Sequence, residues 1–438
     1  MKKEFYFYFA VFFASLSGLL SGFDTGVISG AFLYIKQTFN LTPEISGLLV
    51  SSVSIGAVFG ALINGFLVDK IGRKNILILS SLIFIFGSIF CSISNNVYQL
   101  IISRMLVGSA VGIVSFAGPL YLSEISTKDK RGGVVSCYQI ALTFGILFSY
   151  LVNYFCANLE SSWRVMLFAG AIPAIILFLG MLKQKDTPRW YVLKNRIDCA
   201  KAILEKLNPT SSQDIEIENI KNAIIHNEKI KLNKKLIMPF VIGIGIMFVQ
   251  IATGINAIIY YAPTIFKNLG FSSNQDALFI TIFIGLINFL MTFVALVFVD
   301  KLGRKPLLFL GLFGMLASLL VLSSVFVLDF PFVKYLAIIS CAIYILCFSM
   351  SLGPIGLLLI SEVFPLRYRG SAMSVAIISN FIFNFIVTGL FPILFTKLGG
   401  CITFLIFALI CILSILFVCF VVPETKGISL EEIEAKWS

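Results

Sequence analysis

Long apolar runs alternate with short charged segments along the whole chain. Runs such as 76–94 and 404–423 are apolar on every face of a helix and lack the strict alternation of a β-barrel strand. About 20 apolar residues in helical form cross the hydrocarbon core of a bilayer. The charged clusters therefore delimit an all-α membrane protein with twelve predicted spans, at 7–33, 45–68, 76–94, 99–122, 132–155, 164–182, 239–262, 278–299, 306–328, 334–360, 371–396 and 401–422.

The composition supports lipid as the solvent of this chain. Of its 438 residues, 58% are hydrophobic and only 13% are charged, and the mean hydropathy is +0.99. A soluble globular protein is excluded, because so few charged residues could not cover a water-facing surface. The nine Cys are scattered without a Cys-x-x-Cys pair, so we expect no disulfide framework, no metal site and no cofactor.

The basic residues predict the orientation in the membrane. If both termini are cytoplasmic, most Lys and Arg fall on the cytoplasmic side, as the positive-inside preference requires. The net charge of +11 then reflects topology, with attraction to anionic membrane lipid as a consequence, and nucleic-acid binding is not expected. The apolar start resembles a secretory signal, but it continues past Asp24 without a small-residue cleavage pattern, so we expect it to be retained as the first span.

A single long polar stretch divides the spans into two sets of six. We predict an N-terminal six-helix bundle at 1–182, a cytoplasmic helical linker at 183–238, and a C-terminal six-helix bundle with a short cytoplasmic tail at 239–438. Within the linker, 189–207 and 213–229 show the helical spacing of apolar residues.

The two halves carry the same charged residues in the loops after their second and fourth spans. These are Asp69, Arg73, Glu124 and Arg131 in the first half, and Asp300, Arg304, Glu362 and Arg369 in the second half. The ends of the halves also match loosely, with Asp186-Thr-Pro-Arg189 after the sixth span and Pro423-Glu-Thr-Lys-Gly427 after the twelfth. Such repeats predict two similar bundles with a ligand site between them near the membrane midplane.

The repeated carboxylates are not explained by topology alone. The positive-inside preference accounts for Lys70 and Lys128, but not for acidic residues at matching positions. Carboxylate–guanidinium pairs can bridge neighbouring helices, so we expect these residues to form an intracellular latch that is closed when the site faces outward and broken when it opens inward. An exposed pair contributes about 1 kcal/mol or less, so only a network of pairs could bias the equilibrium.

Asp24 is the acidic residue that lies deepest within a predicted span. A charge at the centre of a span costs about 2.5–3.5 kcal/mol on insertion scales, so Asp24 requires a partner or a proton. Arg104 on the fourth span is the nearest candidate in the same half. Two other arrangements stay open at this point, a permanent buried ion pair and an Arg104 that binds backbone carbonyls.

Several motifs together resemble the sugar porter family of the major facilitator superfamily. They are the twelve spans, the paired Asp-Lys-x-Gly-Arg-Lys loops, Gln250-x-x-x-Gly254-Ile-Asn256 leading to Tyr260-Tyr261, and Pro423-Glu-Thr-Lys-Gly427. The chain is most similar to bacterial proton-coupled xylose, galactose and arabinose symporters. The resemblance implies sugar–proton symport by alternating access, and we expect a monomer in the bacterial inner membrane.

The resemblance also assigns candidate site residues. Asp24 and Arg104 match the proton-coupling pair of the bacterial symporters. The positions that match sugar contacts are Gln139, Gln250, Asn256, Tyr261, Asn288 and Asn384. An amide both donates and accepts hydrogen bonds, as a sugar hydroxyl does. The alternative for a single intramembrane amide is a hydrogen bond between helices, but the cluster beside Gly254 favours a ligand.

Three departures from the family pattern leave the substrate open. Ile251 stands where the family often has a second Gln, Leu357 where a Trp follows Gly-Pro, and Phe381 where a Trp follows Asn. A lost hydrogen-bonding partner can change selectivity by orders of magnitude. A pentose, a polyol or a cyclitol therefore remains a candidate beside the common hexoses.

The sequence also bears on functions other than symport. The residues show no phosphate loop, metal cluster or nucleophile–base pair, so an enzyme is not expected. A facilitative sugar uniporter is the first alternative, and Asp24 with Arg104 argues against it. A membrane sugar sensor without transport is the alternative from another class, and a channel is disfavoured because no ring of like charges is evident.

Overall fold

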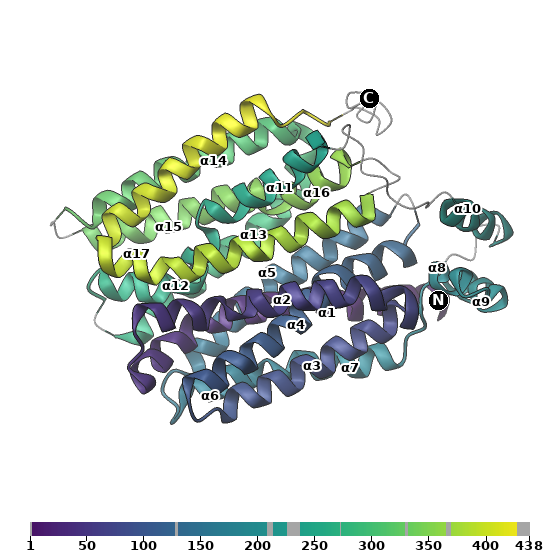
Figure 1. The fold of residues 1–438 in the computed structure, drawn as a ribbon, viewed down its shortest axis with the longest axis horizontal. Coiled ribbons are helices and arrows are strands. Elements are labelled where there is room, and N and C mark those ends of the chain that lie inside the picture. The colour runs from purple at the N-terminus through teal and green to yellow at the C-terminus, as the bar shows by residue number, and fades with distance from the viewer. Residues whose placement is uncertain are drawn as a thin grey trace.

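The computed structural model describes residues 2–127, 130–207, 213–225, 237–271, 273–328, 332–364 and 369–426. Every regular element in this part of the chain is an α-helix. Long helices run side by side along one direction, with the first half of the chain in one bundle and the second half in the other (Figure 1). Both termini and the linker helices lie at the same end, which we call the linker end; the opposite end is the far end.

The first half supplies six crossings. Its helices are α1 (Lys2–Phe39), α2 (Pro43–Ile71), α3 (Arg73–Ile93), α4 (Val97–Ile125), α5 (Arg131–Cys156), and the pair α6 (Ser162–Ala169) and α7 (Ala171–Leu182), which together make the sixth crossing. Side chains cap several starts: the Asn96 Oδ1 accepts the Gln99 backbone N–H at 2.9 Å at the start of α4. Such caps satisfy donors that have no partner within the helix.

The linker contains three short helices, α8 (Pro188–Leu193), α9 (Ile197–Leu207) and α10 (Gln213–Ile225). The expectation of one continuous helix over 189–207 is wrong, because Asn195 takes a left-handed backbone conformation with φ 56° and ends α8. The second linker helix begins at Gln213 as predicted, and 226–229 lie outside the described residues. Val192, Ala200, Leu204 and Ile217 form a small apolar core that holds the three helices together.

The second half supplies the remaining crossings. Its helices are α11 (Ile237–Ala252) with α12 (Ile255–Asn268), α13 (Asn274–Leu302), α14 (Arg304–Val325), α15 (Val333–Met350) with α16 (Leu352–Val363), and α17 (Arg369–Phe420). In the described part of the chain, eleven helical stretches are long and apolar enough to cross a membrane, and the last of them, Ala372–Phe420, reverses at Gly399 with φ 79° and contains two crossings. The predicted twelve-span helical fold is confirmed.

Span seven is broken in the middle of the second bundle. Gly254 has φ 97°, which ends α11 and starts α12 in a new direction. The break frees backbone carbonyls inside the bundle, and the Tyr344 hydroxyl donates to the Thr253 carbonyl at 2.9 Å. Irregular backbone at membrane depth is tolerated where neighbouring helices satisfy it in this way. The break brings Asn256 and the residues after it against α17.

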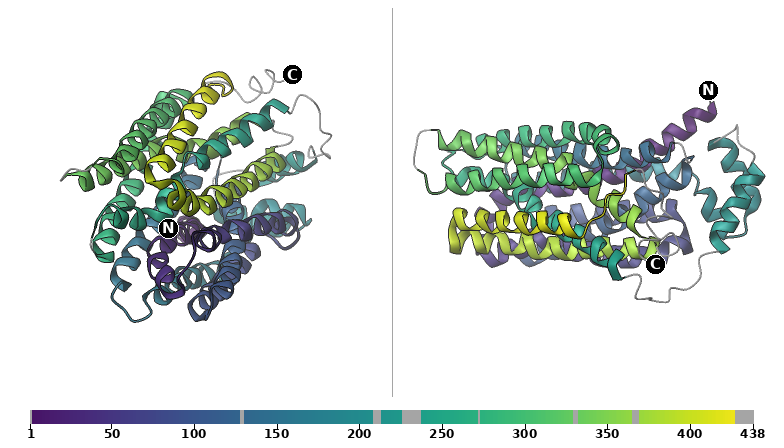
Figure 2. Two further views of the ribbon diagram at one scale, coloured as in Figure 1. Left: turned by 60° about the vertical axis from the view of Figure 1, so that its left-hand side comes forward. Right: turned by 90° about the horizontal axis from the view of Figure 1, so that it is seen from above.

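The two halves are closed against each other from the middle of the molecule to the far end. A Cβ added to Gly47 on α2 would lie 2.0 Å from the Gly389 carbonyl on α17, so these backbones touch. The Tyr150 hydroxyl on α5 donates to the Ile259 carbonyl on α12 at 3.3 Å. Figure 2 shows the two bundles, each made of one half of the chain, from two further sides.

The seam between α1 and α5 generates a first prediction. A Cβ added to Gly22 would lie 1.8 Å from the Leu142 carbonyl oxygen, so a Gly22→Ala variant must push α5 away from α1. We expect a loss of about 1–3 kcal/mol in the free energy of unfolding, as for other overpacked cores. Thermal unfolding of the purified protein in detergent measures it.

Gly65→Ala is the matched control, because a Cβ at Gly65 meets no atom within 4 Å. Alanine is favoured over glycine inside a helix by roughly 0.5–1 kcal/mol, so this variant should unfold at the same or a higher temperature. Equal unfolding temperatures for the two variants would contradict the packing argument.

Candidate functional site

A chain of amides lies where α12, α17 and α2 meet. The Asn256 Nδ2 donates to the Asn384 Oδ1 at 2.9 Å, and the Asn384 Nδ2 donates to the Ser54 Oγ at 2.8 Å and to the Tyr260 hydroxyl at 3.4 Å. Asn384 is only 6% exposed, whereas Asn256 is half-buried. Polar groups from both halves are therefore joined near the middle of the membrane span.

A second amide pair lies at the breaks of spans seven and ten. The Gln250 Nε2 donates to the Leu352 carbonyl at 2.9 Å and to the Gly353 carbonyl at 3.3 Å, and its Oε1 accepts from the Asn380 Nδ2 at 3.0 Å. Leu352 and Gly353 begin α16, directly after the break at Ser351. Gln250 thus links α11, α16 and α17 and remains half-buried.

The other candidate sugar contacts have separate partners. The Asn288 Oδ1 accepts from the Ser349 hydroxyl at 2.8 Å. The Tyr261 hydroxyl donates to the Thr388 carbonyl at 3.2 Å, and its ring, 1% exposed, stacks on Phe391 with 4.9 Å between centroids. Gln139 is half-buried on α5, and in the described part of the chain its amide forms no hydrogen bond with the other amides.

Three polar partners in this region were not predicted as site residues. Asn380 lies one helical turn before Asn384 on the same face of α17, a spacing of four that the sequence already displays. Ser54 and Tyr260 bind Asn384. No sequence signal singles out Ser54, because serines also occur at 51 and 52, and only the packing shows that the Ser54 hydroxyl reaches Asn384.

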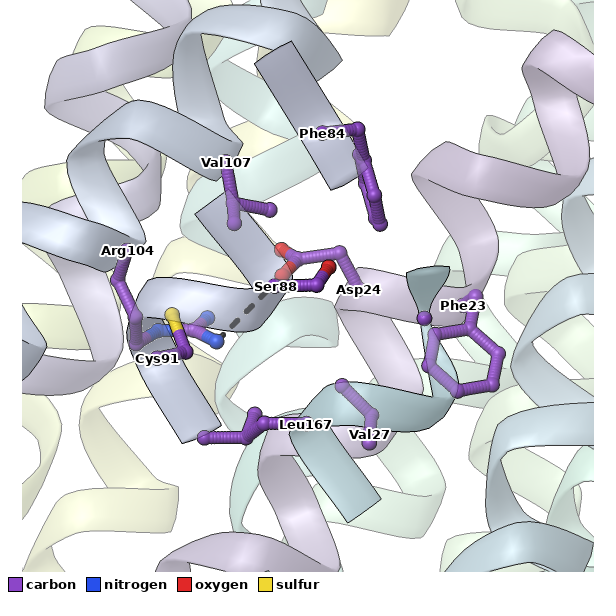
Figure 3. A pocket seen from close by; sticks show the side chains of 10 residues that line it. Phe23, Asp24, Val27, Phe84, Ser88, Cys91, Arg104, Val107 and Leu167 are labelled. Atoms are coloured by element: carbon purple, nitrogen blue, oxygen red, sulfur yellow. Dashed lines mark hydrogen bonds and ion pairs between the residues drawn. The ribbon is translucent and has the colours of Figure 1, made fainter. Parts of the chain in front are cut away.

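The structure brings Asp24 and Arg104 into contact inside the first half. The Arg104 Nη1 lies 3.4 Å from the Asp24 Oδ1, and the two residues are 1% and 5% exposed, respectively. They line a small cavity with Ser88, Cys91 and neighbouring apolar side chains, which has room for about one water molecule (Figure 3). The Arg104 Nε has no hydrogen-bond partner among the described residues.

The chemistry of this pair is balanced between two opposing effects. Removal of the two charges from water is unfavourable, while their mutual attraction at short range is favourable. A single contact of 3.4 Å is long for a charge-assisted hydrogen bond. Such a pair can be separated by a proton on Asp24, since a neutral carboxyl no longer attracts the guanidinium.

The repeated charged loops form equivalent clusters at the linker end of each half. In the first half the Arg73 Nε lies 2.9 Å from the Glu124 Oε2, and its Nη1 lies 2.9 Å from the Asp69 Oδ1. In the second half the Arg304 Nη2 lies 2.9 Å from the Glu362 Oε1. The side chains of Asp300 and Arg369 lie outside the described residues. Arg131 is exposed and forms no ion pair with the described part of the chain.

These ion pairs join helices of the same half. Arg73 and Glu124 connect α3 to α4, and Arg304 and Glu362 connect α14 to α16. Because both partners of each pair lie in the same half, these pairs by themselves do not hold one half against the other. They are present while the halves are closed at the far end.

Each cluster contains a helix cap contributed by the end of its half. Asp186 accepts the backbone N–H groups of Arg73 at 3.0 Å and Lys74 at 3.3 Å, at the start of α3. Glu424 accepts those of Arg304 at 3.0 Å and Lys305 at 2.9 Å, at the start of α14. A carboxylate at a helix N-terminus meets both the free donors and the helix dipole.

The following threonines complete the repeat. The Thr187 hydroxyl donates to the Glu124 Oε2 at 2.5 Å, and the Thr425 hydroxyl donates to the Glu362 Oε2 at 2.6 Å. The match between the two half-ends in the sequence was the signal for this arrangement, but its loose form did not reveal that these residues cap α3 and α14.

The two caps differ in their electrostatics. Burial raises the pKa of the Asp186 carboxyl to about 6, because it outweighs the backbone hydrogen bonds from Thr187, Arg73 and Lys74. Burial also opposes ionisation of Glu424, but that residue is more exposed, and its backbone N–H donors together lower its pKa.

Twelve crossings in two homologous halves, with polar side chains from both halves meeting between them, define a polytopic membrane carrier. Residues 10–437 match the family described as "Sugar (and other) transporter". The chain belongs to this sugar porter family of the major facilitator superfamily, as the motifs suggested.

Relatives match over nearly the whole chain. The galactose-proton symporter of Escherichia coli (strain K12) is 38% identical over 434 residues, which cover 98% of this chain and 93% of the relative. The D-xylose transporter of Levilactobacillus brevis is 39% identical over 434 residues, covering 98% and 95%. A solved structure, the partially occluded inward open conformation of the xylose transporter XylE from E. coli, matches with a TM-score of 0.87 and 29% identity, covering 97% of this chain and 99% of that one.

The unequal caps generate a second prediction. Because the pKa of Asp186 is raised to about 6 in the folded protein, above its ordinary value of 3.8, the native state binds the extra proton and gains stability as the pH falls. Wild type should therefore gain about 1 kcal/mol between pH 7 and pH 5 relative to Asp186→Asn, which cannot titrate. Unfolding temperatures in detergent at the two pH values measure the difference.

Glu424→Gln is the matched control at the equivalent position. The lowered pKa of Glu424 has the opposite sign, so its stabilisation is present above the unfolded pKa and is lost as the pH falls through the lower folded pKa. Between pH 7 and pH 5 the difference in unfolding temperature between wild type and Glu424→Gln should therefore stay constant. If the difference in unfolding temperature between wild type and Asp186→Asn were equally constant, Asp186 would not titrate in this range.

Proposed function

We propose that this protein is a proton-coupled monosaccharide symporter that works by alternating access. The observation that carries the proposal is the buried Asp24–Arg104 pair in one half beside a chain of amides that joins the two halves. The relatives support it, since one is named a galactose-proton symporter and another a D-xylose transporter. Two coupled sites, one for a proton and one for a neutral polar cargo, are what symport requires.

The sugar binds to the amides between the halves. Gln139, Gln250, Asn256, Tyr261, Asn288 and Asn384 are the proposed contacts. Amides that bind each other in this state can exchange those partners for sugar hydroxyls, which offer the same donors and acceptors. This exchange leaves no buried amide unsatisfied, and an unsatisfied amide would be unfavourable.

The proton binds to Asp24. Protonation from the outer side neutralises the carboxyl and releases Arg104, which permits closure around the sugar. Loss of the proton to the cytoplasm restores the pair. Because Asp24 and Arg104 lie on α1 and α4 of the same half, the proton alters the packing within this half, and α1 transmits the change to α12, against which it packs.

The linker end faces the cytoplasm in this proposal, and the far end faces the outside of a bacterial inner membrane. The domain division is 1–182, 183–238 and 239–438, and one chain is the functional unit. Asp69, Arg73, Glu124, Arg131, Asp300, Arg304, Glu362 and Arg369 form the cytoplasmic gating network. Their described pairs keep each half rigid, so that the halves move as two bodies.

Transport in proteoliposomes tests the proposed function. A panel of labelled pentoses, hexoses, polyols and cyclitols is offered with and without an imposed pH gradient, acidic outside. We expect at least one monosaccharide to accumulate above equilibrium only with the gradient. Equal accumulation after the gradient is collapsed would reject proton coupling, and transport of no carbohydrate would reject the function as a whole.

Asp24→Asn tests the role of the pair. An amide cannot carry the proton, so we expect uphill accumulation and its pH dependence to be lost while sugar counterflow between equal concentrations persists. Asp276→Asn is the control, because Asp276 is an exposed carboxylate in the first turn of α13. Uphill uptake by Asp24→Asn at the wild-type rate would show that Asp24 is a structural ion-pair member.

A further inference from the structure

We propose that Ser54 on α2 is the gate residue that fastens the first half to the sugar-binding amides when the far end is closed. The inference rests on the proposed function for its link to sugar, but the bond itself is a property of this structure. Ser54 lies on the opposite half from Asn256 and Asn384 and was not among the predicted site residues.

The geometry makes Asn384 the meeting point of three helices. Its Oδ1 is occupied by the Asn256 amide of α12, and its Nδ2 donates to the Ser54 Oγ at 2.8 Å and to the Tyr260 hydroxyl of α12 at 3.4 Å. The bond to Ser54 is the shorter of the two that Nδ2 makes. Ser54 is 3% exposed and Asn384 is 6% exposed, so solvent does not weaken it in this state.

The contacts around this bond are of other kinds. Gly47 and Gly389 bring the backbones of α2 and α17 together, but such packing does not fix the orientation of a side chain. The Lys397 Nζ and the Glu44 Oε1 lie 3.9 Å apart at the far end, and both side chains are exposed, so this pair adds little. The Ser54–Asn384 hydrogen bond, by contrast, is a buried and directional contact between α2 and α17.

Opening of the far end must break this bond, because its two partners belong to different halves. The Asn384 N–H then needs another acceptor, which water or a sugar hydroxyl can provide in the opened site. The Ser54 hydroxyl and the cargo thus satisfy the same amide in alternate states. Removal of the Ser54 hydroxyl destabilises only the state in which the far end is closed. The fraction of molecules with an open far end therefore increases.

The labelling rate of a cysteine under the gate tests the bond without any assumption about sugar. Ser51→Cys is the reporter, since Ser51 is fully buried on α2 and its Oγ lies 3.2 Å from a Cβ built on Gly389. The purified protein in detergent is treated with a hydrophilic maleimide, and modification of residue 51 is followed by peptide mass spectrometry. Adding Ser54→Ala should raise the rate by about 2- to 10-fold, the range of one net hydrogen bond.

Ser52→Ala is the matched control on the same helix. Ser52 is fully buried, and its hydroxyl donates to the Leu49 carbonyl of α2 at 2.8 Å, so this variant removes a hydroxyl without touching the other half. It should label at the rate of the reporter alone. Ser54→Thr keeps the hydroxyl and should also retain a slow rate, and size-exclusion profiles confirm that each variant is folded.

Transport then links the gate to cargo. In proteoliposomes, Ser54→Ala should lower the sugar concentration for half-maximal uptake from the far-end side by about 2- to 10-fold, because less binding energy is used to open the gate. Equal labelling rates for Ser54→Ala and Ser52→Ala would overturn the inference, whatever the transport result. A wild type that carries no sugar would instead reject the proposed function, and the labelling comparison would still decide the role of Ser54.

Discussion

The structure depends on the requirement that polar groups within the hydrocarbon find their main partners inside the protein. Asp24 and Arg104 satisfy this requirement by pairing across α1 and α4, and the amides of α11, α12 and α17 do so by binding each other and the carbonyls freed at helix breaks. Water could form hydrogen bonds with these groups wherever they were exposed, but the hydrocarbon of lipid cannot. Each of these bonds that a conformational change breaks therefore needs a replacement partner at once, because an unsatisfied buried polar group is unfavourable.

The duplicated architecture gives the two halves equal scaffolds and different contents. In both halves an Arg begins the third span, and its guanidinium binds a Glu. A carboxylate from the end of the half caps the start of that same span. Inside this common frame, the first half holds the charged pair and the second half holds most of the amides. The frames also differ in one respect, because Asp186 is buried whereas Glu424 is partly exposed. The charged pair and most of the amides thus lie in different halves.

The predicted elements agree with the structure where hydropathy alone decides them. A run of apolar residues has one stable form in lipid, so all twelve crossings appear. The boundaries within the polar linker were harder to predict. Asn195 ends a helix by taking a left-handed backbone conformation, and the spacing of the apolar residues around it gives no sign of this break. The charged loops were identified by their repetition, but their partners were not, since Asp186 lies more than a hundred residues from the Arg73 backbone that it caps. Pairing at that distance depends on where the sixth crossing ends in space.

The sequence by itself determined the solvent of the protein, the number of its crossings, the division into two similar halves and the types of side chain available for binding. These follow from local hydropathy, charge and repetition, which are independent of how the helices are rotated about their axes. Only the tertiary structure decided that Gln250 binds Asn380, that Asn384 reaches Ser54 in the opposite half, and that the Arg–Glu pairs lie within the halves. A rotation of one helix by a single residue would exchange the partners that this helix contributes without altering its hydropathy, and the close packing of glycine-lined helices fixes that rotation.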